Sequence, residues 1–218
     1  MDKIEIQKIS EQALKAHEKE DYAKAEKLFL EALYLLDDKA NPLYQRLVYG
    51  LGINYALQEN YEGAKSCFQE GRFNAIKAQN MEFELQMIHE LIVVCRKAEE
   101  YQTAELLVEE EILYRKTHTP DDLIGLVTAY YEGAMTFLSS LHFKRSNLYL
   151  KEALVQAKNI PDDRYTAWIY MGMGDLYFAQ NENDLAKKAY QKSLAIYEKY
   201  ENKKISNILC LRLRQTEL

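Results

Sequence analysis

Apolar residues recur along this chain at three- and four-residue spacing, in segments of roughly 15 to 20 residues. This period predicts amphipathic α-helices, because residues three and four apart lie on one helix face. Only 8 Gly and 3 Pro interrupt the 218 residues, so few points force a helix to break. We therefore predict an all-α protein, with helices at residues 4–18, 22–38, 42–58, 61–79, 82–98, 101–117, 120–139, 143–158, 162–180, 182–201 and 204–215.

Every second helix carries the same motif, a small residue followed four positions later by a large apolar one. The small residues, roughly 40 positions apart, are Ala25, Ala64, Ala104, Ser146 and Ala186, and the large ones are Phe29, Phe68, Val108, Leu150 and Tyr190. Three positions further on, four copies have a small residue again, but the third copy has Glu111. One hairpin cannot bury such a face alone, so these in-phase copies predict stacked helical hairpins.

A Leu-Gly-x-x-Tyr pattern on the first helix completes the repeat. It occurs at Leu51, Gly52 and Tyr55, and as Met173, Gly174 and Tyr177. With Ala-x-x-x-Phe-x-x-Ala on the following helix, it resembles the tetratricopeptide repeat (TPR) family. This resemblance implies a right-handed α-solenoid of five hairpins with a C-terminal capping helix. We expect one array over residues 1–218, with repeats at 4–40, 41–80, 81–119, 120–160 and 161–201 and the cap helix at 204–215.

The repeats are longer than the 34 residues of the TPR family. Long repeats of this kind are similar to the peptide receptors of Gram-positive quorum-sensing regulators, the Rap/PlcR type. Prolines between repeats, at Pro42, Pro120 and Pro161, are expected to occupy first helical positions, with acidic residues in the first turn.

Composition excludes several classes of partner. The net charge is -6, and no basic stripe precedes the short Lys203–Arg214 end, so nucleic-acid binding is not expected. The longest apolar runs have about five residues, against the roughly 20 that a membrane span needs. Three cysteines without a C-x-x-C pair and an N-terminus without an apolar stretch favour a soluble, cytoplasmic protein.

No constellation of catalytic or metal-binding residues stands out. The histidines, His17, His89, His118 and His142, are isolated and predicted to be solvated or capping residues. No histidine is placed to activate Cys95, which is expected to be a buried structural thiol. Acidic runs such as Glu109–Glu111 are expected to lie on solvated faces. We predict no enzyme activity, no metal and no cofactor.

The TPR resemblance implies a binding groove lined by first-helix residues two, five, nine and twelve of each repeat. In this chain those positions hold Arg46, Tyr49, Ile53 and Ala56; Gln86, His89, Val93 and Arg96; Thr128, Tyr131, Met135 and Leu138; and Trp168, Met171, Asp175 and Phe178. We expect Arg46 and Arg96 to hold an acidic group and Asp175 a basic one. The carboxylate clamp that some TPR domains use for chaperone tails is absent, because its positions carry Ser10, Leu14 and Tyr49.

These features predict a non-enzymatic scaffold or adaptor that holds a protein or an extended peptide of apolar character. Two alternatives remain open: a homo-oligomeric structural protein, and a peptide-sensing module of a bacterial quorum-sensing-type regulator. Such regulators usually carry a further N-terminal domain. Since the first repeat begins close to Met1, the second alternative predicts the sensing module alone. Strong curvature or an inward cap helix would bury part of the groove.

Overall fold

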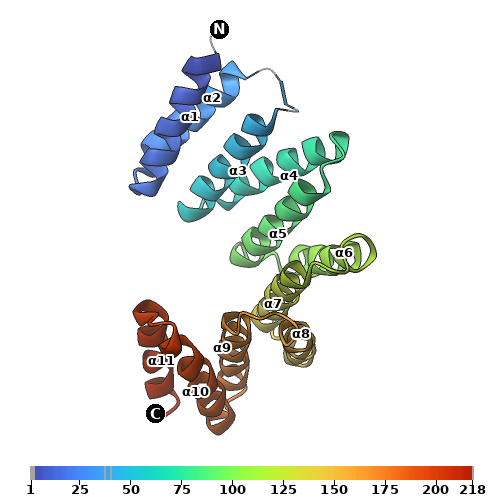
Figure 1. Ribbon diagram of the computed structural model, residues 1–218, viewed down its shortest axis with the longest axis vertical. Coiled ribbons are helices and arrows are strands. Elements are labelled where there is room, and N and C mark those ends of the chain that lie inside the picture. The colour runs from blue at the N-terminus through green and yellow to red at the C-terminus, as the bar shows by residue number, and fades with distance from the viewer. Residues whose placement is uncertain (1–2, 37, 40, 218) are drawn as a thin grey trace. The chain divides into compact units, whose positions relative to one another are not determined.

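The computed structural model describes residues 3–36, 38–39 and 41–217, and this part of the chain forms helices and turns without any strand (Figure 1). The helices are α1 (Lys3–Glu18), α2 (Tyr22–Leu35), α3 (Pro42–Leu57), α4 (Tyr61–Lys77), α5 (Met81–Lys97), α6 (Tyr101–His118), α7 (Leu123–Ser139), α8 (Phe143–Ala157), α9 (Arg164–Ala179), α10 (Asn183–Lys199) and α11 (Lys203–Gln215). Their number and order confirm the all-α prediction.

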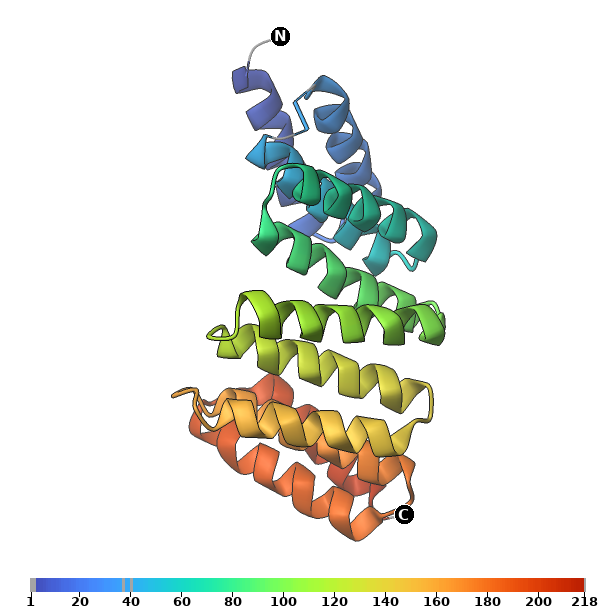
Figure 2. The ribbon, with the colours of Figure 1, turned by 90° about the vertical axis from the view of Figure 1, so that its right-hand side faces the viewer.

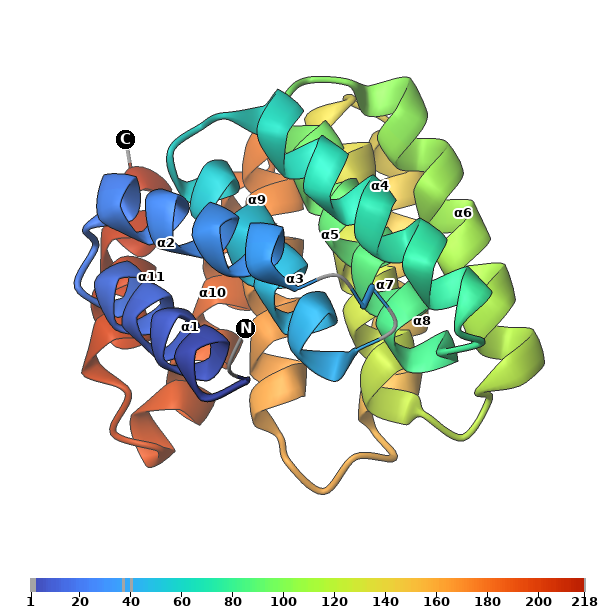
Figure 3. The same cartoon turned by 90° about the horizontal axis from the view of Figure 1, so that it is seen from above.

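The helices form two compact units, Met1–Leu107 and Val108–Leu218, and the boundary falls within α6. In the first unit α1 pairs with α2 and α3 with α4, and these neighbours lie side by side in Figure 3. In the second unit α7 pairs with α8 and α9 with α10; Figure 2 shows the antiparallel course of α7 and α8. First helices of successive hairpins also touch, α1 with α3 and α7 with α9, while α11 packs on α10.

The repeated small residues lie where the motif predicts, at helix crossings with no room for a larger side chain. All five, Ala25, Ala64, Ala104, Ser146 and Ala186, have 0% exposure. The glycines of the first-helix pattern serve the same purpose. A Cβ atom on Gly52 would lie 2.4 Å from the ring of Phe68, and one on Gly174 would lie 2.3 Å from the ring of Tyr190. Close approach of two helices therefore explains why small and aromatic residues alternate in the repeat.

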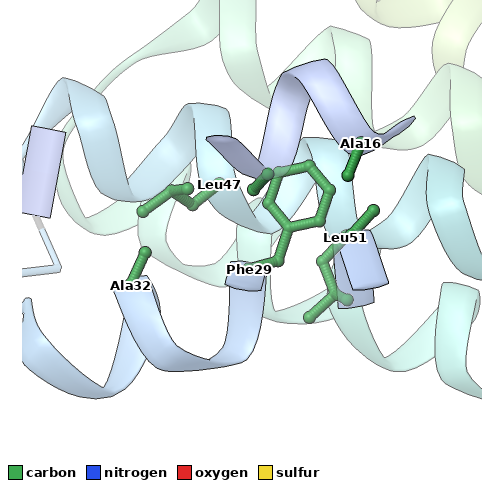
Figure 4. Close-up of a cluster of buried hydrophobic side chains, with 7 residues drawn as sticks. Ala16, Phe29, Ala32, Leu47 and Leu51 are labelled. Atoms are coloured by element: carbon green, nitrogen blue, oxygen red, sulfur yellow. The ribbon is translucent and has the colours of Figure 1, made fainter. Parts of the chain in front are cut away.

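In the core of the first two hairpins, one aromatic side chain packs against residues of three helices. Phe29 of α2 is fully buried and lies among Ala16 of α1 and Leu47 and Leu51 of α3 (Figure 4). Burying a side chain of this size contributes about 1.5–3 kcal/mol, so Phe29 links the first hairpin to the second.

Seven of the turns between helices share one backbone geometry, although none of them has glycine at the critical position. Seven described residues other than glycine have positive φ, and each follows a helix: Glu20, Glu59, Gln79, Glu99, Leu141, Asn181 and Glu201. The next residue donates its N–H to a carbonyl five positions back, as Asn60 does to Tyr55 at 2.9 Å. This is the Schellman motif, and its last residue caps the following helix.

Two expected helix starts were wrong. Pro42 begins α3 as predicted, but Pro120 and Pro161 precede α7 and α9 by three residues. The reason at α7 is Asp122, whose carboxylate accepts a hydrogen bond from the Gly125 N–H at 2.9 Å and thus makes Asp122 the N-cap. The helix α2 also ends earlier than residue 38, because Leu36 is extended, with φ -104° and ψ 93°.

Candidate functional site

The first unit contains a pocket of about 290 Å³ between the two first helices α1 and α3. Its lining residues are Gln7, Ser10, Glu11, Leu14 and His17 of α1, Phe29 of α2, and Leu43, Arg46, Leu47, Tyr49, Gly50 and Ile53 of α3. Three of the residues predicted for the groove, Arg46, Tyr49 and Ile53, therefore come together here. We call this the α1–α3 pocket.

The floor of the α1–α3 pocket is apolar because α3 has glycine at one position. A Cβ atom on Gly50 would lie 2.9 Å from the ring of Phe29. The missing side chain lets the Phe29 ring reach the pocket from α2, and Leu14, Leu43 and Ile53 are further apolar lining residues. Such a surface can bury an apolar group of a ligand, which stabilises binding by about 25 cal/mol per Å² removed from water.

Polar groups at the α1–α3 pocket are partly engaged within the chain. Gln7 Nε2 donates to Glu11 Oε1 at 3.2 Å, and the buried Ser10 hydroxyl donates to the carbonyl of Ile6 at 2.7 Å. Arg46, in contrast, is exposed. Its guanidinium offers only donors, so Arg46 can pair with an acidic group of a ligand.

His17 is held in place from behind the pocket. Its Nδ1 lies 3.1 Å from Oδ1 of Asn54, a fully buried residue of α3, and Asn54 Nδ2 donates to the carbonyl of Tyr22 at 3.0 Å. The ring also meets the rings of Tyr22 and Phe29 edge to face, with centroids 5.8 and 6.4 Å apart. The expectation that His17 is a solvated or capping residue was wrong, because the side chain belongs to a hydrogen-bonded chain that joins α1, α2 and α3.

Sequence reasoning missed the contribution of α1 to this pocket, although the signal was present. The groove positions were assigned in repeats two to five and not in repeat one. Shifting the repeat-two positions toward the N-terminus by the spacing between Ala25 and Ala64 gives the equivalent residues of repeat one. These are Gln7, Ser10, Leu14 and His17, and all four line the pocket.

The predicted residues of repeat three lie on α5 next to this region of the first unit. His89 and Arg96 are both half-buried and do not line the α1–α3 pocket. Tyr49 of α3 links the two helices, since its hydroxyl donates to Glu90 Oε1 at 3.1 Å. Burial raises the pKa of Tyr49, and the Glu90 carboxylate adds to that effect, so Tyr49 remains a neutral donor.

In the second unit, two predicted groove residues form an aromatic stack. The rings of Tyr131 on α7 and Trp168 on α9 have centroids 3.7 Å apart and planes inclined by 29°. Tyr131 and Met135 both approach α9 at Gly172, where an added Cβ atom would lie 2.9 Å from the Tyr131 ring and 3.1 Å from Met135 Cε. Tyr131 is buried and Trp168 is half-buried, so Trp168 presents the accessible part of the stack.

Asp175 already has a basic partner within the chain. Its carboxylate lies 2.9 Å from Arg212 Nη1 of the cap helix and accepts a hydrogen bond from the Tyr190 hydroxyl at 2.8 Å. Burial raises the pKa of Asp175, and Arg212 and Tyr190 act in the opposite direction. Met171, one turn earlier on α9, packs against the core cluster that contains Leu209 of α11. The cap helix therefore covers part of the α9 surface that was predicted to meet a ligand.

The described residues show little that could support bond-making chemistry. They contain no group of three or more His, Cys, Asp or Glu side chains that could hold a metal ion. Burial raises the pKa of the Cys95 thiol to about 11 and that of Cys67 to about 12, which keeps both in the unreactive thiol form. Across the helices that the structure describes, none is long and apolar enough to span a bilayer.

Comparison with known proteins gives the same fold. Residues 149–199 match the family model of the tetratricopeptide repeat. No curated protein matches this sequence. Among solved structures, a STAND-type signal transduction ATPase with a tetratricopeptide repeat sensor from Pyrococcus horikoshii superimposes with a TM-score of 0.77 and 17% identity, over 95% of this chain and 32% of that one.

Two further structures are relevant to the long repeats. Aspartyl phosphate phosphatase F from Bacillus subtilis has a TM-score of 0.68 and 12% identity, over 100% of this chain and 61% of its own. The apo form of RapI has a TM-score of 0.65 and 13% identity, over 97% of this chain and 70% of its own. At such identities the likeness concerns the fold alone. The repeat register, the helical hairpins and the family match together show that this chain is an α-solenoid similar to the tetratricopeptide repeat proteins, including the long-repeat Rap type.

Proposed function

We propose that this protein binds a protein or an extended peptide through apolar side chains that enter the inner surface of its first helices. The observation that carries this proposal is the α1–α3 pocket, where an apolar floor lies next to the exposed cation of Arg46. Interfaces derive most of their energy from a few apolar or aromatic anchors that fill pockets, with polar groups around them. The TPR-like fold is typical of such binding scaffolds, and we assign the protein no catalytic role.

The proposed ligand follows from the chemistry of the lining. It should carry at least one bulky apolar side chain, because Phe29, Leu14 and Ile53 offer no polar partner. An acidic group nearby would pair with Arg46, which has five donors and no acceptor. We propose that the partner is a cytoplasmic protein or peptide, and that neither a nucleic acid nor a membrane is involved.

A second candidate is a peptide-sensing module of a bacterial quorum-sensing-type regulator. It is favoured by the structural likeness to RapI and to aspartyl phosphate phosphatase F, which cover this chain almost completely. The two candidates differ in the ligand. A sensing module should recognise a short free peptide, whereas a scaffold should recognise a segment within a folded or disordered protein. The homo-oligomer alternative predicts a mass above that of one chain in light scattering of the purified protein.

The proposal is tested with peptides selected from a phage-displayed random library on the purified protein. Affinities of the selected peptides are measured by isothermal titration calorimetry for the parent and for two variants. Gln7→Trp places an indole at the mouth of the α1–α3 pocket, while Lys8→Trp adds the same indole on an exposed residue of α1 outside the lining. We expect Gln7→Trp to weaken binding by about tenfold or more, the equivalent of losing one anchor.

Lys8→Trp serves as the matched control and should leave the affinity within about twofold of the parent. Equal affinities for the two variants would show that the selected peptides bind elsewhere. A selection that enriches no peptide at all would remove the basis of the proposal.

A further inference from the structure

One side chain gives the α1–α3 pocket a specific polar requirement. The carbonyl oxygen of Tyr22 can only accept, so the Asn54 amide must turn its Nδ2 toward it, as the 3.0 Å hydrogen bond shows. Asn54 then presents Oδ1, an acceptor, to His17 Nδ1 at 3.1 Å. Two acceptors cannot share a hydrogen bond, so Nδ1 of His17 carries the proton.

The position of this proton decides what the other ring nitrogen does. In a neutral imidazole with hydrogen on Nδ1, Nε2 has a free lone pair and acts as an acceptor. Nε2 has no hydrogen-bond partner among the residues that the structure describes, and His17 lines the pocket. Edge-to-face contacts with Tyr22 and Phe29 hold the ring in place. The pocket thus combines an apolar floor with a lining histidine that carries one open acceptor.

The volume limits the size of the group that can enter. A cavity of about 150 Å³ holds a benzene molecule, and pockets for drug-sized ligands begin at about 300 Å³. At about 290 Å³, the α1–α3 pocket suits a single large side chain, such as a phenol or an indole.

We propose that the α1–α3 pocket recognises a tyrosine or tryptophan side chain of the partner, whose hydroxyl or indole N–H donates a hydrogen bond to His17 Nε2. This inference rests on the proposed function and narrows it to one class of anchor. Phenylalanine, leucine and methionine would fill the space but have no donor, and would leave Nε2 unpaired in an apolar site. Tyrosine and tryptophan combine a large apolar body with a polar tip.

Other polar groups around the pocket fit this role less well. Arg46 has donors only, and Ser10, whose hydroxyl is bound to the carbonyl of Ile6, is only 2% exposed and offers little surface to a ligand. Glu11 is a second acceptor, but it accepts from Gln7 and is exposed to water. Substitution of Glu11 can therefore be used to separate its effect from that of His17.

The test uses two peptides that differ by one oxygen atom, acetyl-Gly-Ser-Tyr-Ser-Gly-amide and acetyl-Gly-Ser-Phe-Ser-Gly-amide. Each is titrated to millimolar concentration into 15N-labelled protein, and the dissociation constants are obtained from the shifts of the amide resonances of the pocket residues. We expect the tyrosine peptide to bind about fivefold more tightly, as one added neutral hydrogen bond implies.

Two variants assign that preference to one residue. In His17→Phe the ring contacts remain possible but the acceptor is gone, so the two peptides should bind with about equal affinity. In Glu11→Gln the preference should persist. A preference that survives His17→Phe, or that disappears in Glu11→Gln, would overturn the inference.

His17→Phe also leaves Asn54 Oδ1 without its donor and could lower stability. A second measurement needs no variant: the imidazole 15N resonances of His17 in the parent protein. They should show the proton on Nδ1, and the Nε2 resonance should move when the tyrosine peptide is added and stay in place with the phenylalanine peptide. A proton on Nε2 in the free protein would contradict the inference.

The outcomes also separate this inference from the proposed function. If both peptides shift the pocket resonances with equal affinity, the donor requirement is wrong while apolar anchoring stands. If neither peptide shifts these resonances, the aromatic anchor is wrong. The broader proposal then fails only if the library-selected peptides are also insensitive to Gln7→Trp.

Discussion

Arg115 neutralises Glu111, a carboxylate with no exposed surface in the second half of α6. Nε and Nη2 of Arg115 both lie 2.8 Å from Glu111 Oε1, and Nη1 lies 3.1 Å from Asp122 Oδ2 in the following turn. Glu111 occupies the position where the other repeats have alanine, glycine or serine. A buried charge is tolerated only when it is paired, so the third repeat replaces small-residue packing by an ion cluster.

Gly125 makes room for this cluster and should not tolerate a side chain. A Cβ atom at Gly125 would lie 2.1 Å from both Arg115 Nη1 and Asp122 Oδ2. Gly125→Ala should therefore lower the free energy of unfolding by about 1–3 kcal/mol, since it displaces a buried guanidinium from its partners. Urea denaturation followed by circular dichroism measures the change.

Gly63→Ala is the matched control, because both glycines are third in their helix and donate their N–H to the capping side chain. At Gly63 the nearest atoms are 2.9 Å and 3.0 Å away, on Asn60 and Tyr55. Gly63→Ala should change stability by less than about 1 kcal/mol, because better helix propensity offsets the tighter contact. If both substitutions had the same cost, the ion cluster would not be the cause.

Ala64 tests the register of the repeat in the first unit. Its side chain has 0% exposure and belongs to a cluster with Phe68 and Met87. Ala64→Leu should overpack this crossing and lower the free energy of unfolding by about 1–3 kcal/mol. Ala195→Leu, at an exposed position of α10, should leave the stability within about 0.5 kcal/mol. A parent-like melting temperature for Ala64→Leu would contradict the observed packing.

The sequence was sufficient to predict the fold because the repeat is defined by the sizes of the side chains at fixed positions. Small residues at five crossings and large apolar residues four positions later are properties of the sequence itself, and all five small residues are buried. The geometry of the turns was harder to predict from the sequence, because their positive-φ residues are Glu, Gln, Leu or Asn and not glycine. Backbone hydrogen bonds, which composition does not show, fix that geometry.

The candidate site could be predicted only in part. The TPR resemblance assigned Arg46, Tyr49 and Ile53 to the groove face of their helix, and all three line the α1–α3 pocket. The role of His17 depends on Asn54, a residue far away in sequence, so periodicity could not reveal it. Glu111 was expected on a solvated face, but it is buried because Arg115, four residues later, supplies the opposite charge.

Asp175 should titrate above the ordinary range of an aspartate. Burial raises its pKa, so the folded chain takes up this proton at higher pH than the unfolded chain does. The free energy of unfolding therefore increases as the pH falls through the raised pKa of Asp175 toward the ordinary pKa of an unfolded aspartate. This contribution is lost as the pH rises through the raised pKa. Carboxyl 13C resonances followed by NMR report the midpoint directly.

Arg212 holds this pKa down, because its guanidinium attracts the ionised carboxylate. Arg212→Gln should therefore raise the midpoint of Asp175 further. Arg214→Gln, on an exposed residue of the same helix, should leave it unchanged. An unaltered midpoint in Arg212→Gln would show that the cap helix does not pair with α9 in solution.

The three cysteines should differ in reactivity. Cys210 is exposed, whereas Cys67 is half-buried and Cys95 is buried, and burial raises the pKa of the latter two thiols. Since the thiolate is the nucleophile, Ellman's reagent at mildly alkaline pH should react quickly with Cys210 only. All three should react in guanidinium chloride. Rapid modification of Cys95 in the native protein, identified by peptide mass spectrometry, would contradict its burial.

Trp168 is a candidate anchor for a ligand of the second unit. It is half-buried and stacks on Tyr131, so iodide should quench its fluorescence in part. If it is a binding anchor, Trp168→Ala should weaken binding of a groove ligand by about 2 kcal/mol or more, or about 30-fold, without unfolding the protein. The ligands are the library-selected peptides, and affinity is measured by calorimetry.

Tyr170→Ala provides the comparison, since Tyr170 is an aromatic residue of the same helix with the same intermediate exposure. Its ring lies under Lys192 of α10, away from the Tyr131 stack. Loss of the Tyr170 ring should affect stability but not affinity, because residues two positions apart on a helix point about 200° apart. If the two substitutions weaken binding equally, or if Trp168→Ala lowers stability and leaves affinity intact, Trp168 is a packing residue and the stack is part of the core.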